Sequence, residues 1–78
     1  MIKASVVSAA IIDQKDKVEV GEICTLWFNQ NGESAYAEVE KISKFRYEST
    51  TYGWVYTLRG NDVYREGKLI GTYDHISF

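Results

Sequence analysis

The chain contains very little of what small proteins commonly use to reinforce a thin core. Its 78 residues include one cysteine, Cys24, and one histidine, His75. A single cysteine cannot form an intramolecular disulfide, and a structural zinc site needs four ligands that are usually Cys or His. We therefore expect neither a disulfide nor a metal, and the free thiol fits the reducing environment of the cytoplasm.

Proline, an excess of positive charge and long apolar runs are missing as well. Without proline, no strand is interrupted by a residue that lacks a backbone donor. Nine basic and eleven acidic residues give a net charge of −2, which disfavours nucleic-acid binding by the whole surface. No segment approaches the ~20 apolar residues that span a bilayer. Residues 4–12 are apolar, but two serines and a charged flank favour a strand over a cleaved signal peptide, and we expect no membrane association.

Aromatic residues are abundant and predict how the core is filled. Two Trp, six Tyr and three Phe make up 14% of the sequence. Each ring can bury ~150–250 Å² of surface, so rings can fill the core of a short chain that has no covalent staples. A chain of this length forms one domain, which we expect to cover residues 1–78.

Turn-forming residues recur at short intervals, and this spacing predicts an all-β sandwich or barrel. The dipeptide Asn31-Gly32 is the strongest hairpin signal, because both residues readily adopt positive φ. After it, alternation places Ala35, Ala37 and Val39 inward, and Tyr36, Glu38 and Glu40 outward. Ile42 breaks the alternation, which indicates a bulge near Lys41. The predicted strands are residues 2–12, 23–29, 34–42, 54–60 and 68–78, with shorter pieces at 17–20 and 62–67.

The remaining segments give weaker signals. Residues 43–53, "SKFRYESTTYG", have no clear period and are interpreted as a long polar connection. At most one short helical turn is expected, in "STTYG" or "YREG". Ile76 and Phe78 share a face, opposite Tyr73 and His75, and large apolar residues at a chain end indicate a docked strand. We expect this strand to pair with residues 2–12.

The stretch "TYGWVYTLRG", Thr51 to Gly60, has rings at alternate positions. This alternation predicts a strand with Tyr52, Trp54 and Tyr56 on one face. That face is either the inside of a barrel or a platform for a ligand, and of the two we expect Trp54 to contribute mainly to the core. Tyr47 and Tyr52 lie in the polar connection and are expected to be exposed.

Two segments resemble a known group of small barrels. "VEVGEICTLWFNQNGESAYAEVEKI" resembles the opening hairpin of SH3-like barrels, including KOW and Tudor-like varieties. "GWVYTLRGNDVYREGKLI" resembles the continuation in small phage and prophage proteins of this shape. The resemblance covers roughly residues 18–70, and the long first strand departs from the simple five-stranded pattern. It implies a small antiparallel SH3-like barrel of five to seven strands, and an accessory factor that inhibits or adapts a host component.

Catalysis is the least favoured kind of activity. With one histidine, a nucleophile–base pair would have to combine His75 with Cys24 or a serine. Cys24 lies in an apolar strand, where a buried thiol is the usual outcome. No nucleophile elbow, phosphate-binding glycine loop, HExxH or CxxC motif occurs. We expect a protein that is not an enzyme and has no catalytic residues and no cofactor.

Nucleic-acid binding is the alternative function. The segment "KISKFRYE" interleaves cations with rings, and such loops can follow a phosphate backbone while rings stack on bases. The alternative interpretation is that these cations are ordinary solvated residues of a surface loop. The candidate residues for this alternative are Lys41, Lys44, Arg46, Arg59 and Arg65.

Binding to a protein or peptide is the favoured function. SH3-like barrels present aromatic grooves beside their loops. The candidate partner-binding residues are Tyr36, Lys44, Phe45, Arg46, Tyr47, Tyr52 and Trp54. A third hypothesis is a structural or assembly subunit, because a thin-cored chain can bury its apolar N-terminal strand against a second copy and form a homodimer.

Overall fold

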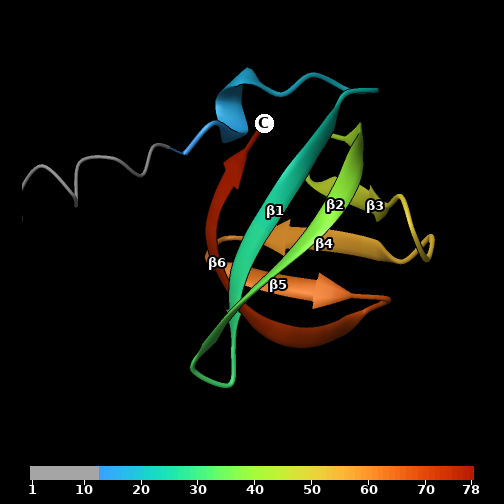
Figure 1. The fold of residues 1–78 in the computed structure, drawn as a ribbon. Coiled ribbons are helices and arrows are strands. Elements are labelled where there is room, and N and C mark those ends of the chain that lie inside the picture. Colours follow the sequence, from blue (N-terminus) through green and yellow to red (C-terminus); the bar gives the residue numbers. More distant parts are fainter. Residues whose placement is uncertain (1–12) are drawn as a thin grey trace, which may run out of the picture.

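Six antiparallel strands close into a barrel in the computed structural model, which describes residues 13–78 (Figure 1). The strands are β1 (Ile23–Gln30), β2 (Glu33–Ser43), β3 (Arg46–Ser49), β4 (Val55–Arg59), β5 (Asp62–Arg65) and β6 (Lys68–Ser77). Each strand pairs with the next in sequence, and β6 pairs with β1 to complete the ring. The predicted all-β fold is confirmed, and the barrel is compatible with an SH3-like fold.

The hairpin predicted from Asn31-Gly32 is present and joins β1 to β2. Asn31 has a φ of 55° and Gly32 a φ of 83°, so both residues adopt the left-handed conformation of a two-residue hairpin turn. This turn fixes the register from Gln30↔Glu33 through to Ile23↔Glu40. Figure 1 shows the tip of this long hairpin projecting beyond the other strands.

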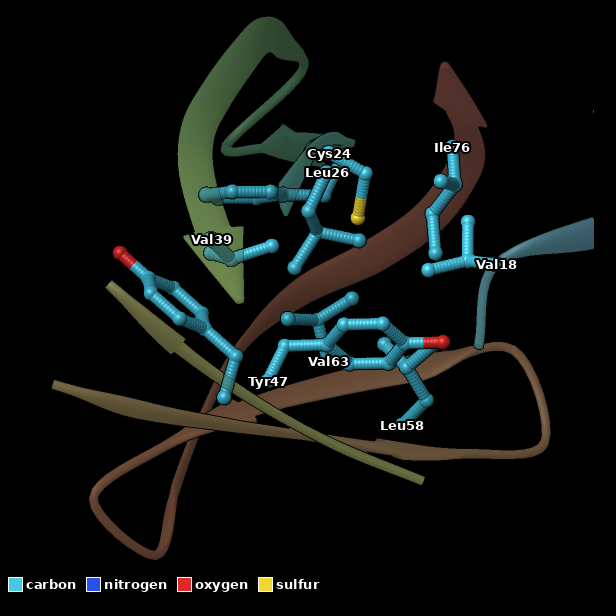
Figure 2. Packing of buried hydrophobic residues seen from close by; sticks show 10 residues of the cluster. Val18, Cys24, Leu26, Val39, Tyr47, Leu58, Val63 and Ile76 are labelled. Carbon is cyan, nitrogen blue, oxygen red and sulfur yellow. The ribbon is translucent and has the colours of Figure 1, made fainter. Parts of the chain in front are cut away.

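The interior is filled by alternate residues of the strands. Figure 2 shows the labelled side chains converging on the centre of the barrel, Val18 from the segment before β1 and the others from the strands. Ala35 and Ala37 pack against this cluster as expected, which confirms the inward face assigned to β2. The buried apolar residues are Val18, Cys24, Leu26, Phe28, Val39, Tyr47, Tyr56, Leu58, Val63 and Ile76.

The polar segment after β2 departs from its prediction. Instead of a long connection, a tight turn at residues 44–45 leads directly into β3, which pairs with both β2 and β4. Tyr47 lies on the inner face of this strand and is fully buried, so the expectation that it is exposed is wrong. The bulge expected near Lys41 is confirmed, because the register of β2 with β3 shifts between Lys41 and Ser43.

The last strand contains a second irregularity. Trp27 pairs with His75 and Phe28 with Tyr73, so Asp74 is an extra residue that reverses the side-chain alternation. Tyr73 consequently packs against the core, whereas His75 points outward. The prediction that these two side chains share a face is wrong because of the bulge.

Residues before β1 lie across the end of the barrel near the C-terminus (Figure 1). The backbone N–H of Gln14 donates to the carbonyl oxygen of Ile76 at 2.8 Å, and the N–H of Phe78 donates to Oε1 of Gln14 at 2.9 Å. The chain end is therefore held, although the Phe78 ring is exposed. The one helical turn of the described chain is η1 (Lys15–Lys17), a 3-10 turn outside both segments in which it was expected.

The predicted strand over residues 2–12, and its pairing with the last strand, lie outside the described residues. Within residues 13–78, β6 pairs with β1 and β5. In this part of the chain no helix has the length and apolar character needed to cross a membrane.

Candidate functional site

A pocket opens beside β2 because β3 is much shorter than its neighbour. β3 ends at Ser49, which pairs with Val39, so the first half of β2 extends beyond it. The chain then turns through residues 50–54 before β4 begins, and this β3–β4 loop forms the opposite wall. The pocket has a volume of about 370 Å³. It is lined by Phe28, Gln30, Ala35, Tyr36, Ala37, Glu38, Ser49, Thr51, Tyr52, Trp54, Tyr56 and Arg65.

Aromatic rings form much of the pocket surface. The rings of Phe28 and Tyr56 are buried and lie 5.9 Å apart, which makes the inner part rigid. At the mouth, the rings of Tyr52 and Trp54 are stacked, with centroids 4.6 Å apart and an interplanar angle of 23°. Gly53, with a φ of 73°, makes the turn that brings these two rings together. An apolar interior with an exposed aromatic rim is typical of a binding site.

The expectation that Trp54 belongs to the core is wrong. Its side chain remains 37% exposed, whereas Tyr56 two residues later is buried. The reason is that β4 begins only at Val55, so Tyr52 and Trp54 lie in the loop and the three rings are not consecutive members of one strand face. All three rings nevertheless line the same pocket.

Hydrogen bonds hold the β3–β4 loop in place. Ser49 is buried, and its Oγ accepts hydrogen bonds from the N–H of Tyr52 at 3.1 Å and of Thr51 at 3.3 Å. Thr50 ties the loop to β2, since its N–H donates to the carbonyl of Glu38 at 3.0 Å and its Oγ1 to the Glu38 carboxylate at 2.7 Å. The aromatic wall is therefore preorganised before any ligand arrives.

One cation, Arg65, and one carboxylate, Glu38, line the pocket. The guanidinium of Arg65 lies 4.5 Å from the centroid of the Trp54 ring, a cation–π contact. Oε2 of Glu66 accepts a hydrogen bond from the N–H of Val55 at 2.8 Å at the start of β4. In the described part of the chain, neither Arg65 nor Glu38 has an oppositely charged partner within 4.0 Å.

The predicted partner-binding residues fall into three groups. Tyr36, Tyr52 and Trp54 are brought together at the pocket. Tyr47 lies in the core, where it is not accessible to a partner. The other three, Lys44, Phe45 and Arg46, lie at the turn between β2 and β3, away from the pocket lining.

Several pocket residues were not singled out from the sequence: Phe28, Ala35, Ala37, Glu38, Tyr56 and, for this function, Arg65. The alternation in β2 did place the two alanines on an inner face. The sequence pattern did not indicate that β3 ends early, and this early end leaves part of the inner face of β2 uncovered.

The five cations considered for nucleic acid are also divided. Lys41 is half-buried and its Nζ donates to the Val18 carbonyl at 3.0 Å, and Arg65 lies at the pocket. Lys44, Arg46 and Arg59 share the outer surface of β3 and β4. The two strands are held together there, because the carbonyl oxygen of Phe45 accepts a hydrogen bond from the N–H of Leu58 and Arg46 pairs with Thr57. This outer basic surface comprises Lys44, Phe45, Arg46, Arg59 and Tyr64, with the Arg59 guanidinium 5.3 Å from the Tyr64 ring.

Cys24 and His75 do not form a nucleophile–base pair. Cys24 points into the core, and burial raises the pKa of its thiol. His75 lies on the outer face, stacked on Trp27 at 5.6 Å. Among residues 13–78, no three Cys, His, Asp or Glu side chains converge as metal ligands would.

Comparison with known proteins gives no assignment. No family model matches the chain, and neither the curated proteins nor the solved structures contain a match. Function must therefore be inferred from the pocket and from the outer surfaces.

Proposed function

We propose that this protein is a non-enzymatic binding module that holds a segment of a protein partner in the pocket beside β2. The observation that carries the proposal is the pair of stacked, solvent-accessible rings, Tyr52 and Trp54, fixed over an apolar interior. Tyrosine and tryptophan dominate the energetics of many interfaces, because large rings bury much area and lose little rotamer entropy.

The loop geometry supports binding rather than mere packing. Tyr52 is 68% exposed and would gain the most from being covered by a partner. Ser49 and Thr50 already hold its backbone, so a ligand does not have to order this wall. Preorganisation of this kind improves affinity by reducing the entropy lost on association.

The sequence resemblance to small phage and prophage barrels supports a more specific role. On that basis we propose an accessory factor that binds a host protein and inhibits or adapts it. A closed barrel with a preformed pocket is compatible with such a role, because it can present a recognition surface without a catalytic centre.

A displayed peptide library panned against the full chain tests the proposal. Peptides selected on the wild type should lose at least about tenfold in affinity for Trp54→Ala or Tyr52→Ala, which is roughly 1.4 kcal/mol. Leu69→Ala is the matched control, because Leu69 is also an exposed apolar residue but does not line the pocket. Equal losses in the pocket variants and in this control would contradict the proposal.

A nucleic-acid interface on the outer basic surface is the second candidate. The observation that favours it is the clustering of Lys44, Arg46 and Arg59 with two rings on adjacent strands. Titration with short single- and double-stranded oligonucleotides at low salt provides the test. Binding that weakens steeply with salt and is lost in a Lys44→Ala/Arg46→Ala double variant would support it, and no binding at low salt would exclude it.

A further inference from the structure

The backbone of β2 has an unpaired edge beside the aromatic pocket. β3 pairs with β2 only from Val39 to Ser43. Among residues 13–78, Glu33–Ala37 therefore pair with β1 alone, although the ring of strands is closed elsewhere. Unpaired strand edges are templates on which an additional strand can form.

Two hydrogen bonds further along β2 show which of its backbone groups point towards the open edge. The N–H of Lys41 donates to Glu22 at 3.0 Å, on the β1 side, whereas the carbonyl of Glu38 accepts from Thr50 at 3.0 Å, on the other side. Because backbone groups alternate along an antiparallel strand, the N–H and C=O of Ser34 and Tyr36 also point away from β1. In the described chain, no backbone hydrogen bond from another segment reaches these two residues.

We propose that the N-terminal segment, residues 2–12, of a second copy of this chain adds as a strand to this edge and places side chains in the pocket. This inference rests on the proposed function, since it names the segment that the pocket holds. Exchange in both directions would give a two-fold dimer, in which each barrel covers the open edge of the other.

The sequence of the segment fits the edge. Glu33–Ala37 offer five residues, or roughly 17 Å at ~3.3 Å per residue, and residues 2–12 are long enough to cover it. The segment is rich in Ile and Val, has no proline, and contains small Ala and Ser side chains that suit a shallow pocket. Its only charge is Lys3, whereas Glu33, Glu38 and Glu48 lie on the strands around the pocket.

The position of Asp13 favours exchange over docking within one chain. Oδ1 of Asp13 accepts hydrogen bonds from the hydroxyl of Tyr73 at 2.6 Å and from the N–H of Ile76 at 3.1 Å. These contacts fix the start of the described chain beside β6. The pocket lies beyond β1, past the far edge of β2, so a segment of the same chain would have to cross the outer faces of both strands.

The test compares Tyr36→Pro with Tyr36→Ala in the full chain by sedimentation over a wide range of concentration. Both variants lose the ring, but only proline removes the N–H that points to the open edge. The wild type should dimerise. The proline variant should associate roughly thirtyfold more weakly than the alanine variant, because a two-fold dimer loses one backbone hydrogen bond in each half, about 2 kcal/mol in all.

A second pair of variants changes the segment instead of the barrel. Val6→Pro should weaken dimerisation more strongly than Val6→Ala, and position 6 precedes all six strands in the sequence. A synthetic peptide of residues 1–12 should dissociate the wild-type dimer. Circular dichroism of each variant checks that the sheet is retained.

The outcomes separate this inference from the proposed function. A wild-type monomer at every concentration, or equal behaviour of the proline and alanine variants, would overturn the exchange. If selected library peptides still bound to that monomer and depended on Trp54, the pocket would remain a binding site for another partner. A monomer in which Val6→Pro still perturbed the pocket would indicate docking within one chain and would likewise overturn the exchange.

Discussion

Replacing Tyr47 by phenylalanine should make the protein more stable. The Tyr47 side chain is fully buried, and its hydroxyl has no hydrogen-bond partner among the described residues. Burial, followed by the nearby Cys24, Asp13 and Asp16, raises the pKa of Tyr47 from 10.0 to about 12. A buried hydroxyl without a partner is a cost that phenylalanine, with nearly the same shape, does not have.

The magnitude of the gain follows from the cost of the hydroxyl. Leaving a buried polar group unsatisfied costs ~1–3 kcal/mol. Phenylalanine fills almost the same volume, so the substitution creates no cavity and adds no atoms. We expect the free energy of unfolding to rise by about 1 kcal/mol at neutral pH. Tyr47→Ala, in contrast, should lose ~3–5 kcal/mol, because it removes a whole ring from the core.

The pH dependence provides a second, independent measure. Because the pKa of Tyr47 is higher in the folded state than in the unfolded state, the proton is held more tightly after folding. Its contribution is fully present below pH 10 and is lost as the pH rises towards about 12. A difference of two pKa units corresponds to at most roughly 3 kcal/mol. The Tyr47→Phe variant should lack this loss, so its free energy of unfolding should fall less steeply between these pH values than that of the wild type.

Urea denaturation of the two proteins at neutral pH, and at steps up to pH 11, tests both expectations. Tyr73 is present in both proteins, and most of its own titration cancels in the comparison, because Tyr47 raises the pKa of Tyr73 less than burial and Asp13 do. A phenylalanine variant that is less stable than the wild type at neutral pH would refute the reasoning, since the hydroxyl would then be making a favourable hydrogen bond. Parallel curves up to pH 11 would refute the account of the raised pKa.

Two further substitutions test how the barrel is closed and how its end is held. Gly71→Ala should cost about 3 kcal/mol in urea denaturation, because a Cβ there would clash with the backbone carbonyl oxygen of Asn29. Gly67→Ala, in open space at a φ of 83°, should cost only ~1–2 kcal/mol. Equal losses in the two variants would contradict a close steric crossing of β6 over β1. Asp13→Asn should cost ~1–2 kcal/mol through weaker hydrogen bonds, including that from Tyr73. Partial burial raises the pKa of Asp13, but the hydrogen bonds to its carboxylate outweigh burial, and the net effect is a lowered pKa. The wild type should therefore be more stable than the asparagine variant above about pH 4, and this difference in stability should disappear as the pH falls below that value. A difference that does not change with pH would contradict this.

Much of the barrel was predictable from local signals. The Asn31-Gly32 turn fixes its own conformation, and the hairpin register follows from it without information from the rest of the chain. Alternation then separates core from surface in β2, where Ala35 and Ala37 pack against the core and Val39 is buried within it. These features depend on neighbours in sequence, which is why the pattern was sufficient.

The errors concern features that depend on contacts between distant segments. β3 has four residues, and two of them, Arg46 and Glu48, face solvent, so it lacks an apolar signature. Tyr47 is buried because β2 and β4 lie on either side of it, which a polar local sequence does not reveal. Similarly, the extra residue Asp74 reverses the face of Tyr73 only because β1 imposes its register on β6.

The pocket is a consequence of the same short strand. In a closed barrel with strands of equal length, every inner face would be covered and every backbone group paired. Here β2 has eleven residues and β3 has four, so the excess of β2 leaves both an open edge and an uncovered inner surface. The aromatic loop that follows β3 covers that surface only in part, which leaves Tyr52 and Trp54 in contact with solvent. The sequence predicted a group of rings in this part of the chain, but whether each ring is buried or exposed depends on where β3 ends.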